Sequence, residues 1–188
     1  MNKYKLIVLL ISLSATLSLG TVNLVNAKDK KSVDARSGQL SKIKLPDLTS
    51  QMHEDLIEAA TIGDLDEVRD LFESNELAPV LTDEHISDPI DYWKKVSVDG
   101  SARDIMAAIA EVFSLPPVKN KDGDFIWPYL AQVQLKNLTP EQQIDLFRLV
   151  GPKQAAKMLE TGQYNYYEAK IGKDGTWHYF KKVEVEKK

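Results

Sequence analysis

Apolar side chains recur at helical spacing in the first half of the chain. They fall every three or four positions over residues 52–60 and again over 65–72, the spacing that places them on one face of a helix. Gly63 and Asp64 separate the two runs, and an aspartate directly before an apolar run is typical of a helix N-cap. The pattern predicts a helical hairpin with a glycine turn.

Four further helices are predicted downstream. The most regular apolar stripe lies within residues 105–113 and is followed by two prolines, which end a helix. The segment Thr139-Pro140-Glu141-Gln142 has the cap, the first-turn proline and the polar third residue of a capping box. Shorter helices are expected after Asp88 and around residues 155–159.

Short apolar segments with turn signals predict strands. A turn at Asp122-Gly123 lies within residues 118–130, and a second turn at residues 172–175 separates 164–171 from 176–185. Strict alternation along the closing hairpin predicts one face with Tyr164, Tyr166, Trp177, Tyr179, Val183 and Val185, and the other with Tyr167, Ala169, Ile171, His178 and Phe180. We therefore predict a single α+β domain over residues 51–188, helix-rich first and ending in a β-hairpin or small antiparallel sheet.

The N-terminus has the three-part pattern of a secretory signal peptide. Lys3 and Lys5 precede an uncharged apolar stretch at 6–19, and Ala27 supplies a small residue at the expected cleavage site. An uncleaved anchor is the alternative, but spanning a bilayer takes roughly 20 apolar residues. We expect an exported, soluble, periplasmic protein with no membrane span after cleavage.

Residues 28–50 are polar and predict a flexible leader between the cleavage site and the domain. Their basic side chains are Lys28, Lys30, Lys31, Arg36, Lys42 and Lys44. The two interpretations are contact with an acidic surface and a solvated tail, and composition favours the tail.

Composition excludes several classes of protein. The 188-residue chain carries 24 basic and 28 acidic residues and no cysteine. Its acidic balance argues against a nucleic-acid partner. Without cysteine there is no disulfide, thiolate nucleophile or cysteine-based metal site. We expect no cofactor.

Two acidic segments resemble metal sites only superficially. Residues 120–124 place oxygen ligands like the start of a calcium loop, but the sixth and twelfth positions are Phe125 and Ala131, where an EF-hand needs glycine and a bidentate acid. The acids and histidine of residues 83–91 match no metal-ligand spacing. We predict no metal site.

Catalysis is a weaker interpretation than binding. Glu168 and His178 lie on paired strands of the predicted hairpin and could supply acid–base chemistry for a small envelope hydrolase, but strict alternation points them to opposite faces. The sequence has no Gly-x-Ser-x-Gly elbow, no phosphate-cradling glycine loop and no His-Glu-x-x-His motif. No catalytic residue is assigned.

The aromatic side chains are the main candidates for a binding surface. Aromatic rings stack on sugars and are enriched at protein contacts, although an aromatic core layer is the alternative. The predicted contact residues are Trp127, Tyr129, Tyr164, Tyr166, Trp177 and Tyr179. The leading hypothesis is a non-catalytic periplasmic binding or accessory protein for an envelope glycan, peptide or protein partner. Two alternatives are the hydrolase and a helical scaffold that uses residues 56–72 for protein contacts.

Three segments carry a resemblance. FIWPY at 125–129, LTPEQ at 138–142 and GKDGTWHYF at 172–180 resemble a group of small exported bacterial proteins of unassigned function, which implies export and a compact domain. The closing hairpin also resembles the ends of cystatin-like and NTF2-like domains. Residues 56–72 resemble one ankyrin-type hairpin, but no second copy follows, and a solenoid needs at least three units.

Overall fold

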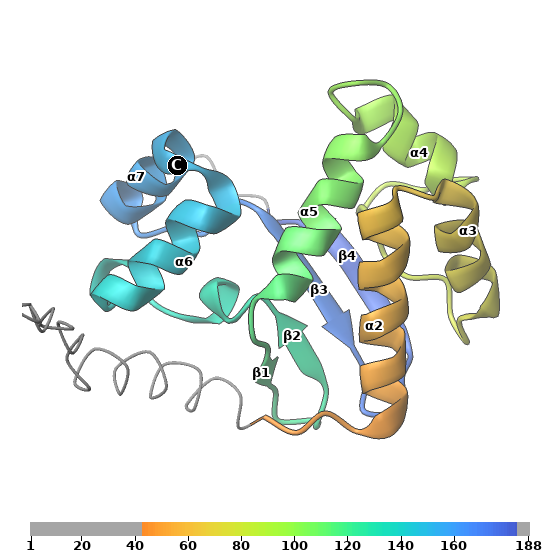
Figure 1. The fold of residues 1–188 in the computed structure, drawn as a ribbon, viewed down its shortest axis with the longest axis horizontal. Coiled ribbons are helices and arrows are strands. Elements are labelled where there is room, and N and C mark those ends of the chain that lie inside the picture. Colours follow the sequence, from red (N-terminus) through yellow and green to blue (C-terminus); the bar gives the residue numbers. More distant parts are fainter. Residues whose placement is uncertain (1–42, 184–188) are drawn as a thin grey trace, which may run out of the picture.

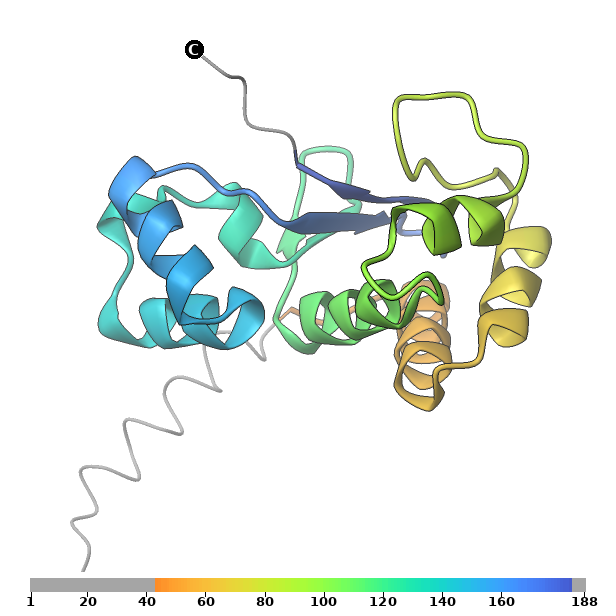
Figure 2. The same ribbon diagram turned by 90° about the horizontal axis from the view of Figure 1, so that it is seen from above.

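Helices α2 and α5 lie against one side of a four-stranded antiparallel sheet in the computed structural model, which describes residues 43–183 (Figure 1). α2 spans Asp47–Ile62 and α5 spans Arg103–Ser114. Both helices contact strand β3, Tyr167–Ile171, and Figure 2 shows them beneath the sheet. The predicted signal peptide and most of the predicted leader lie outside the described residues.

The predicted helical hairpin at the start of the domain is confirmed. α2 ends at Gly63, which has a left-handed φ of 77° that glycine adopts without strain. The Asp64 carboxylate then accepts hydrogen bonds from two backbone N–H groups at the start of α3, Leu65–Ser74. α2 begins at Asp47, so residues 47–50, assigned above to the leader, are helical.

The helix α4 also begins as predicted from its cap. The Asp88 side chain accepts a hydrogen bond from the Asp91 N–H, and a proline occupies the first turn of α4, Pro89–Val96. α5 buries the whole apolar stripe predicted for it. The helix packs against both α2 and β3.

The sheet has the order β1-β2-β3-β4, with every neighbouring pair antiparallel. Strand β1 is Val118–Lys119, β2 is Phe125–Trp127 and β4 is Trp177–Lys182. The α+β class and both predicted strand regions are confirmed. The helices predicted at Thr139-Pro140 and around residues 155–159 form a helical insertion between β2 and β3.

This insertion forms a lobe at one end of the sheet (Figure 1). It contains the 3-10 helices η1 (Tyr129–Gln132) and η2 (Leu135–Asn137), and the α-helices α6 (Pro140–Val150) and α7 (Pro152–Thr161). α6 begins with the predicted capping box, in which Thr139 and Gln142 each bond the other's backbone. No helix within residues 43–183 is long and apolar enough to cross a membrane.

A bulge in the closing hairpin corrects the predicted alternation of faces. Lys170 pairs with Tyr179, but Ile171 pairs with Trp177, so the register shifts by one residue at His178. A bulge places two residues of one strand opposite one of the other. Trp177 therefore shares the buried face of the sheet with Phe180, rather than lying with Tyr179 as strict alternation predicted.

An aromatic cluster fills the core between the sheet and the helices. All three tryptophans, Trp93, Trp127 and Trp177, are at most 2% exposed. The Phe72 ring stacks on Trp177 with centroids 4.8 Å apart, and Phe113 meets Trp127 edge-on at 5.3 Å. Aromatic pairs at these separations add to the free energy of burial, so this cluster is the main stabilising layer of the domain.

Candidate functional site

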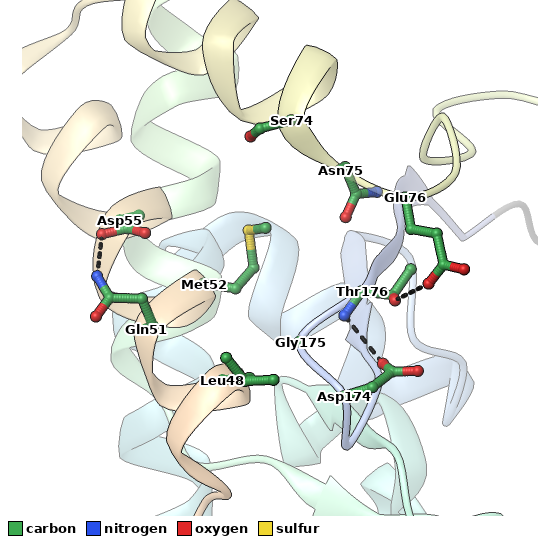
Figure 3. Close-up of a pocket in the computed structure, with 10 residues that line it drawn as sticks. All are labelled: Leu48, Gln51, Met52, Asp55, Ser74, Asn75, Glu76, Asp174, Gly175 and Thr176. Atoms are coloured by element: carbon green, nitrogen blue, oxygen red, sulfur yellow. Dashed lines mark hydrogen bonds between the residues drawn. The ribbon is translucent and has the colours of Figure 1, made fainter.

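A pocket of about 300 Å³ lies where three segments meet: α2, the chain just after α3, and the β3–β4 turn. Figure 3 shows Leu48 and Met52 on α2 between two pairs of polar residues, with Gln51 bonded to Asp55 on one side and Glu76 and Asp174 beside Thr176 on the other. The lining residues come from all three segments. They are Leu48, Gln51, Met52, Asp55, Ser74, Asn75, Glu76, Asp174, Gly175 and Thr176. The cavity is large enough for a side chain or a small ligand.

Hydrogen bonds between distant parts of the chain hold the walls of this pocket together. The Asn75 side chain accepts from the Trp177 N–H at 2.9 Å and donates to the Trp177 carbonyl at 2.7 Å. The Thr49 hydroxyl donates to the Gly172 carbonyl at 2.8 Å, and Thr49 is fully buried. These bonds connect α3 and α2 to the hairpin, so the pocket is built before any ligand arrives.

The pocket combines an apolar floor with acidic walls. Met52 is half-buried, whereas Leu48 is 63% exposed although it is a large apolar residue. The carboxylates come from Asp55, Glu76 and Asp174. Among the described residues that line the pocket there is no lysine, arginine or histidine, so its electrostatic potential favours cations.

The carboxylate of Asp174 is stabilised in its charged form. Its Oδ1 accepts a hydrogen bond from the Thr176 N–H at 3.0 Å, and this bond lowers the pKa of Asp174 below its usual value. A hydrogen bond to the charged form of an acid has this effect. The wall formed by the β3–β4 turn is therefore anionic across the neutral pH range.

A second cavity of about 290 Å³ continues the acidic surface between α2 and α3. Asp55 lines both cavities, and the second one adds Glu58, Glu67 and Asp70. Ala59 and Leu71 complete its lining. We call the six carboxylates of the two cavities the acidic face: Asp55, Glu58, Glu67, Asp70, Glu76 and Asp174.

Four of the six predicted contact residues lie in the core. The exposed fractions are 0% for Trp127 and Trp177, 4% for Tyr129 and 9% for Tyr164. The polar atoms of three of them bond inside the protein: Tyr129 to Asp145, Tyr164 to the Tyr167 carbonyl and Trp177 to the Tyr179 carbonyl. Their burial supports the alternative considered from the sequence, an aromatic core layer.

The other two predicted contact residues, Tyr166 and Tyr179, are only partly buried. Burial raises the pKa of Tyr166 to about 12, and burial together with a hydrogen bond to Glu168 raises the pKa of Tyr179. Both phenols are therefore neutral donors at physiological pH. Ligand contact stays a prediction for these two residues.

The two candidate acid–base residues of the hydrolase alternative have separate surroundings. Glu168 accepts hydrogen bonds from the Tyr179 hydroxyl and from the Gln132 amide. His178 lies near the hairpin turn, with Nε2 2.9 Å from where a Cβ on Gly172 would stand. Glu168 is thus held by neutral donors, and no described contact joins it to His178.

The acidic segments considered as metal sites have other roles. The Asn120 side chain accepts from the N–H groups of Asp122 and Asp124, which makes a tight turn. Asp88 caps α4 and pairs with Arg69 at 2.7 Å. Within residues 43–183, no three histidine or acidic side chains are grouped to hold a metal ion.

Sequence reasoning missed the pocket because its residues come from positions 48 to 176. One signal in the sequence points to it. Residues 47–91 contain 14 acidic residues and a single arginine, and this stretch supplies every carboxylate of the acidic face except that of Asp174. Comparison of the chain with protein-family models, with curated proteins and with solved structures found no match.

Proposed function

We propose that this protein is an exported, non-catalytic binding protein of the cell envelope, and that its pocket takes a cationic side chain of a peptide or protein partner. The observation that carries the proposal is the pairing of an exposed apolar floor with three carboxylates around one preformed cavity. A lysine or arginine has the matching shape, since its aliphatic stem lies on apolar surface while its charged head reaches acids.

Among the envelope ligands considered, a peptide or protein suits the pocket better than a glycan. Sugar recognition uses exposed aromatic faces, and no aromatic side chain lines either described cavity. The pocket shares Asp55 with the second cavity, whose other lining residues lie within 56–72, the hairpin expected from the scaffold alternative to contact proteins. A single surface therefore accounts for both the binding and the scaffold interpretations.

The test is an NMR titration of the chain beginning at Lys28 with the tripeptide Ala-Lys-Ala. The same peptide with an acetylated lysine is the matched control, because acetylation removes the charge and leaves the stem. We expect the charged peptide to shift the backbone amides of Met52, Asp55, Asn75 and Thr176, and the acetylated one to leave them unchanged. Equal binding of the two peptides, or chemical-shift changes confined to amides outside the pocket, would contradict the proposal.

Variants make this test specific to the pocket. Asp55→Asn combined with Glu76→Gln keeps the size of both side chains and removes two charges. Each exposed charge pair contributes about 0.2–1 kcal/mol, so the affinity of the double variant is expected to fall roughly 2- to 30-fold, since a tenfold change is about 1.4 kcal/mol. The matched control is Asp122→Asn with Glu160→Gln, two exposed acids outside the pocket, and its affinity should be unchanged.

The likeness of the domain to cystatin-like and NTF2-like folds also belongs to this proposal. Helices packed on one side of an antiparallel meander support it. Fold likeness carries no function by itself, so the binding proposal does not depend on it.

A further inference from the structure

Among the described residues, no lysine or arginine forms an ion pair with the acidic face, and the base that acts on it is His178, beside Asp174. The ion pairs within residues 43–183 involve other acids: Asp88, Asp99, Asp124 and Asp83. Arg69 is the single arginine or lysine of residues 47–91, and it pairs with Asp88 at 2.7 Å. Six carboxylates thus line two cavities that share Asp55, and none of them has a lysine or arginine partner among the described ion pairs.

A segment of opposite charge is joined directly to this surface. Residues 28–42 carry five basic and two acidic side chains, for a formal charge of +3, whereas residues 43–183 carry 15 basic and 24 acidic ones, for −9. The described chain begins at Ile43, and Leu48, five residues later, already lines the pocket. Charge and connectivity therefore favour this segment as the occupant of the acidic face.

The segment is also long enough to reach the whole face. Fifteen residues span at most roughly 50 Å when extended. The 16-residue helix α2 is about 24 Å long, at 1.5 Å per residue. Counted from Ile43, the segment is therefore long enough to return to α2 and pass Asp55 and Glu58.

We propose that residues 28–42 dock on the acidic face and hold it until a cationic partner displaces them. The docking is argued from the charge and the length of the segment alone. Its competition with a cationic partner rests, in addition, on the proposed function. Short tethers give effective concentrations in the millimolar range, so even weak exposed ion pairs populate the docked state. Because exposed charge pairs are screened by salt, docking weakens as ionic strength rises.

The experiment uses paramagnetic relaxation, for which a cysteine-free chain is well suited. A nitroxide label is attached at Ser37→Cys in the chain beginning at Lys28. Docking is expected to broaden the amides of residues 55–70 at least twofold more than those of α7, and the difference should vanish at about 0.5 M NaCl, where the screening length is below about 5 Å.

Charge-neutral variants supply the control. Lys28, Lys30, Lys31 and Arg36 are each replaced by Gln in one variant, and this change should abolish the selective broadening. The matched variant Lys153→Gln with Lys157→Gln, on α7, should retain it. Uniform broadening, no broadening, or broadening that survives neutralisation of the leader overturns the docking.

Competition is measured separately with the same Ala-Lys-Ala probe. The leader-neutralised chain is expected to bind the peptide severalfold more tightly than the unchanged chain. Equal affinities, with selective broadening intact, overturn the competitor role and leave the docking supported. Absence of peptide binding to both chains counts against the proposed function, while the relaxation result still decides the docking.

Discussion

The two halves of the domain divide stability and charge between them. Residues 47–91 contain 14 acidic side chains, one arginine and a single Phe, Tyr or Trp, namely Phe72. Residues 92–183 contain 10 acidic and 13 basic side chains together with 13 aromatic ones, including every tryptophan. The aromatic half supplies most of the core, and the acidic half supplies all of one described cavity and most of the lining of the other.

This difference shows which side chains stay exposed after folding and can therefore bind a partner. Burying an aromatic ring lowers the free energy of the folded state, so most of the rings lie in the core. Isolated carboxylates are costly to bury, so the acids of α2 and α3 stay at the surface. Three tests follow, in order of expected effect on stability.

The largest effect is expected from Trp177→Ala. Trp177 is fully buried and stacks on Phe72, so its removal leaves a large cavity and should cost about 3–5 kcal/mol. The measurement is the free energy of unfolding by urea denaturation. Such a loss would be a large share of the roughly 5–15 kcal/mol of a typical domain.

Tyr166→Ala is the matched comparison, because Tyr166 is partly exposed and should cost less than half as much. A Trp177→Ala domain of unchanged stability would break the division between a structural aromatic half and a binding acidic half. It would return Trp177 to the role in ligand contact predicted from the sequence.

A smaller effect is expected where the two halves meet, at Gly175 of the β3–β4 turn. Gly175 has φ = 89°, and a Cβ there would stand 2.9 Å from the Leu48 Cβ and 3.0 Å from the Leu48 carbonyl oxygen on α2. Gly175→Ala combines left-handed strain of about 1–2 kcal/mol with overpacking of about 1–3 kcal/mol.

Gly63→Ala is the control, because Gly63 also has a left-handed φ, of 77°, but a Cβ there meets nothing within 4 Å. It should show the strain alone in thermal or urea unfolding. If the two variants lose equal stability, the close approach of the turn to α2 contributes nothing.

The smallest effect concerns His53, the residue of α2 that enters the aromatic half. Its ring stacks on Trp127 at 5.3 Å, and Nε2 donates to the Phe113 carbonyl at 3.0 Å. Burial lowers the pKa of His53 below 6.5, although the Phe113 carbonyl and Glu54 act in the opposite direction. The folded state thus binds protons less readily than the unfolded state.

The sign of the pH dependence follows from linkage. The stabilisation is fully present above about pH 6.5, the unfolded pKa of histidine, and it declines as pH falls from there toward the folded pKa. The measurement is the free energy of unfolding between pH 7.5 and 5.0 for the unchanged chain and for His53→Gln. A parallel pH dependence of the two chains would contradict this assignment.

Local sequence signals were sufficient for most of the helices. Asp64, Asp88 and Thr139 each form the cap expected of them, and the stripe of α5 is buried as its spacing indicated. Capping and helical periodicity depend on residues within a few positions of one another. The same reasoning located both strand regions, because turn residues are also local.

The register of strand pairing could not be predicted from such local signals. The bulge at His178 shifts the register by one residue, and a shift of one residue moves a side chain to the opposite face. Trp177 consequently lies in the core, whereas strict alternation had grouped it with Tyr179. The candidate site was missed for a related reason, since Met52, Glu76 and Asp174 are distant in the sequence.

The sequence by itself determined the α+β class, the helix boundaries set by caps, and the concentration of acids in residues 47–91. Only the tertiary structure decided which aromatic residues are buried and which carboxylates share a cavity. The reason is that burial depends on strand register and on contacts between distant segments, such as the bonds from Asn75 to Trp177 and from Thr49 to Gly172. Those contacts form only when α2, α3 and the closing hairpin pack together.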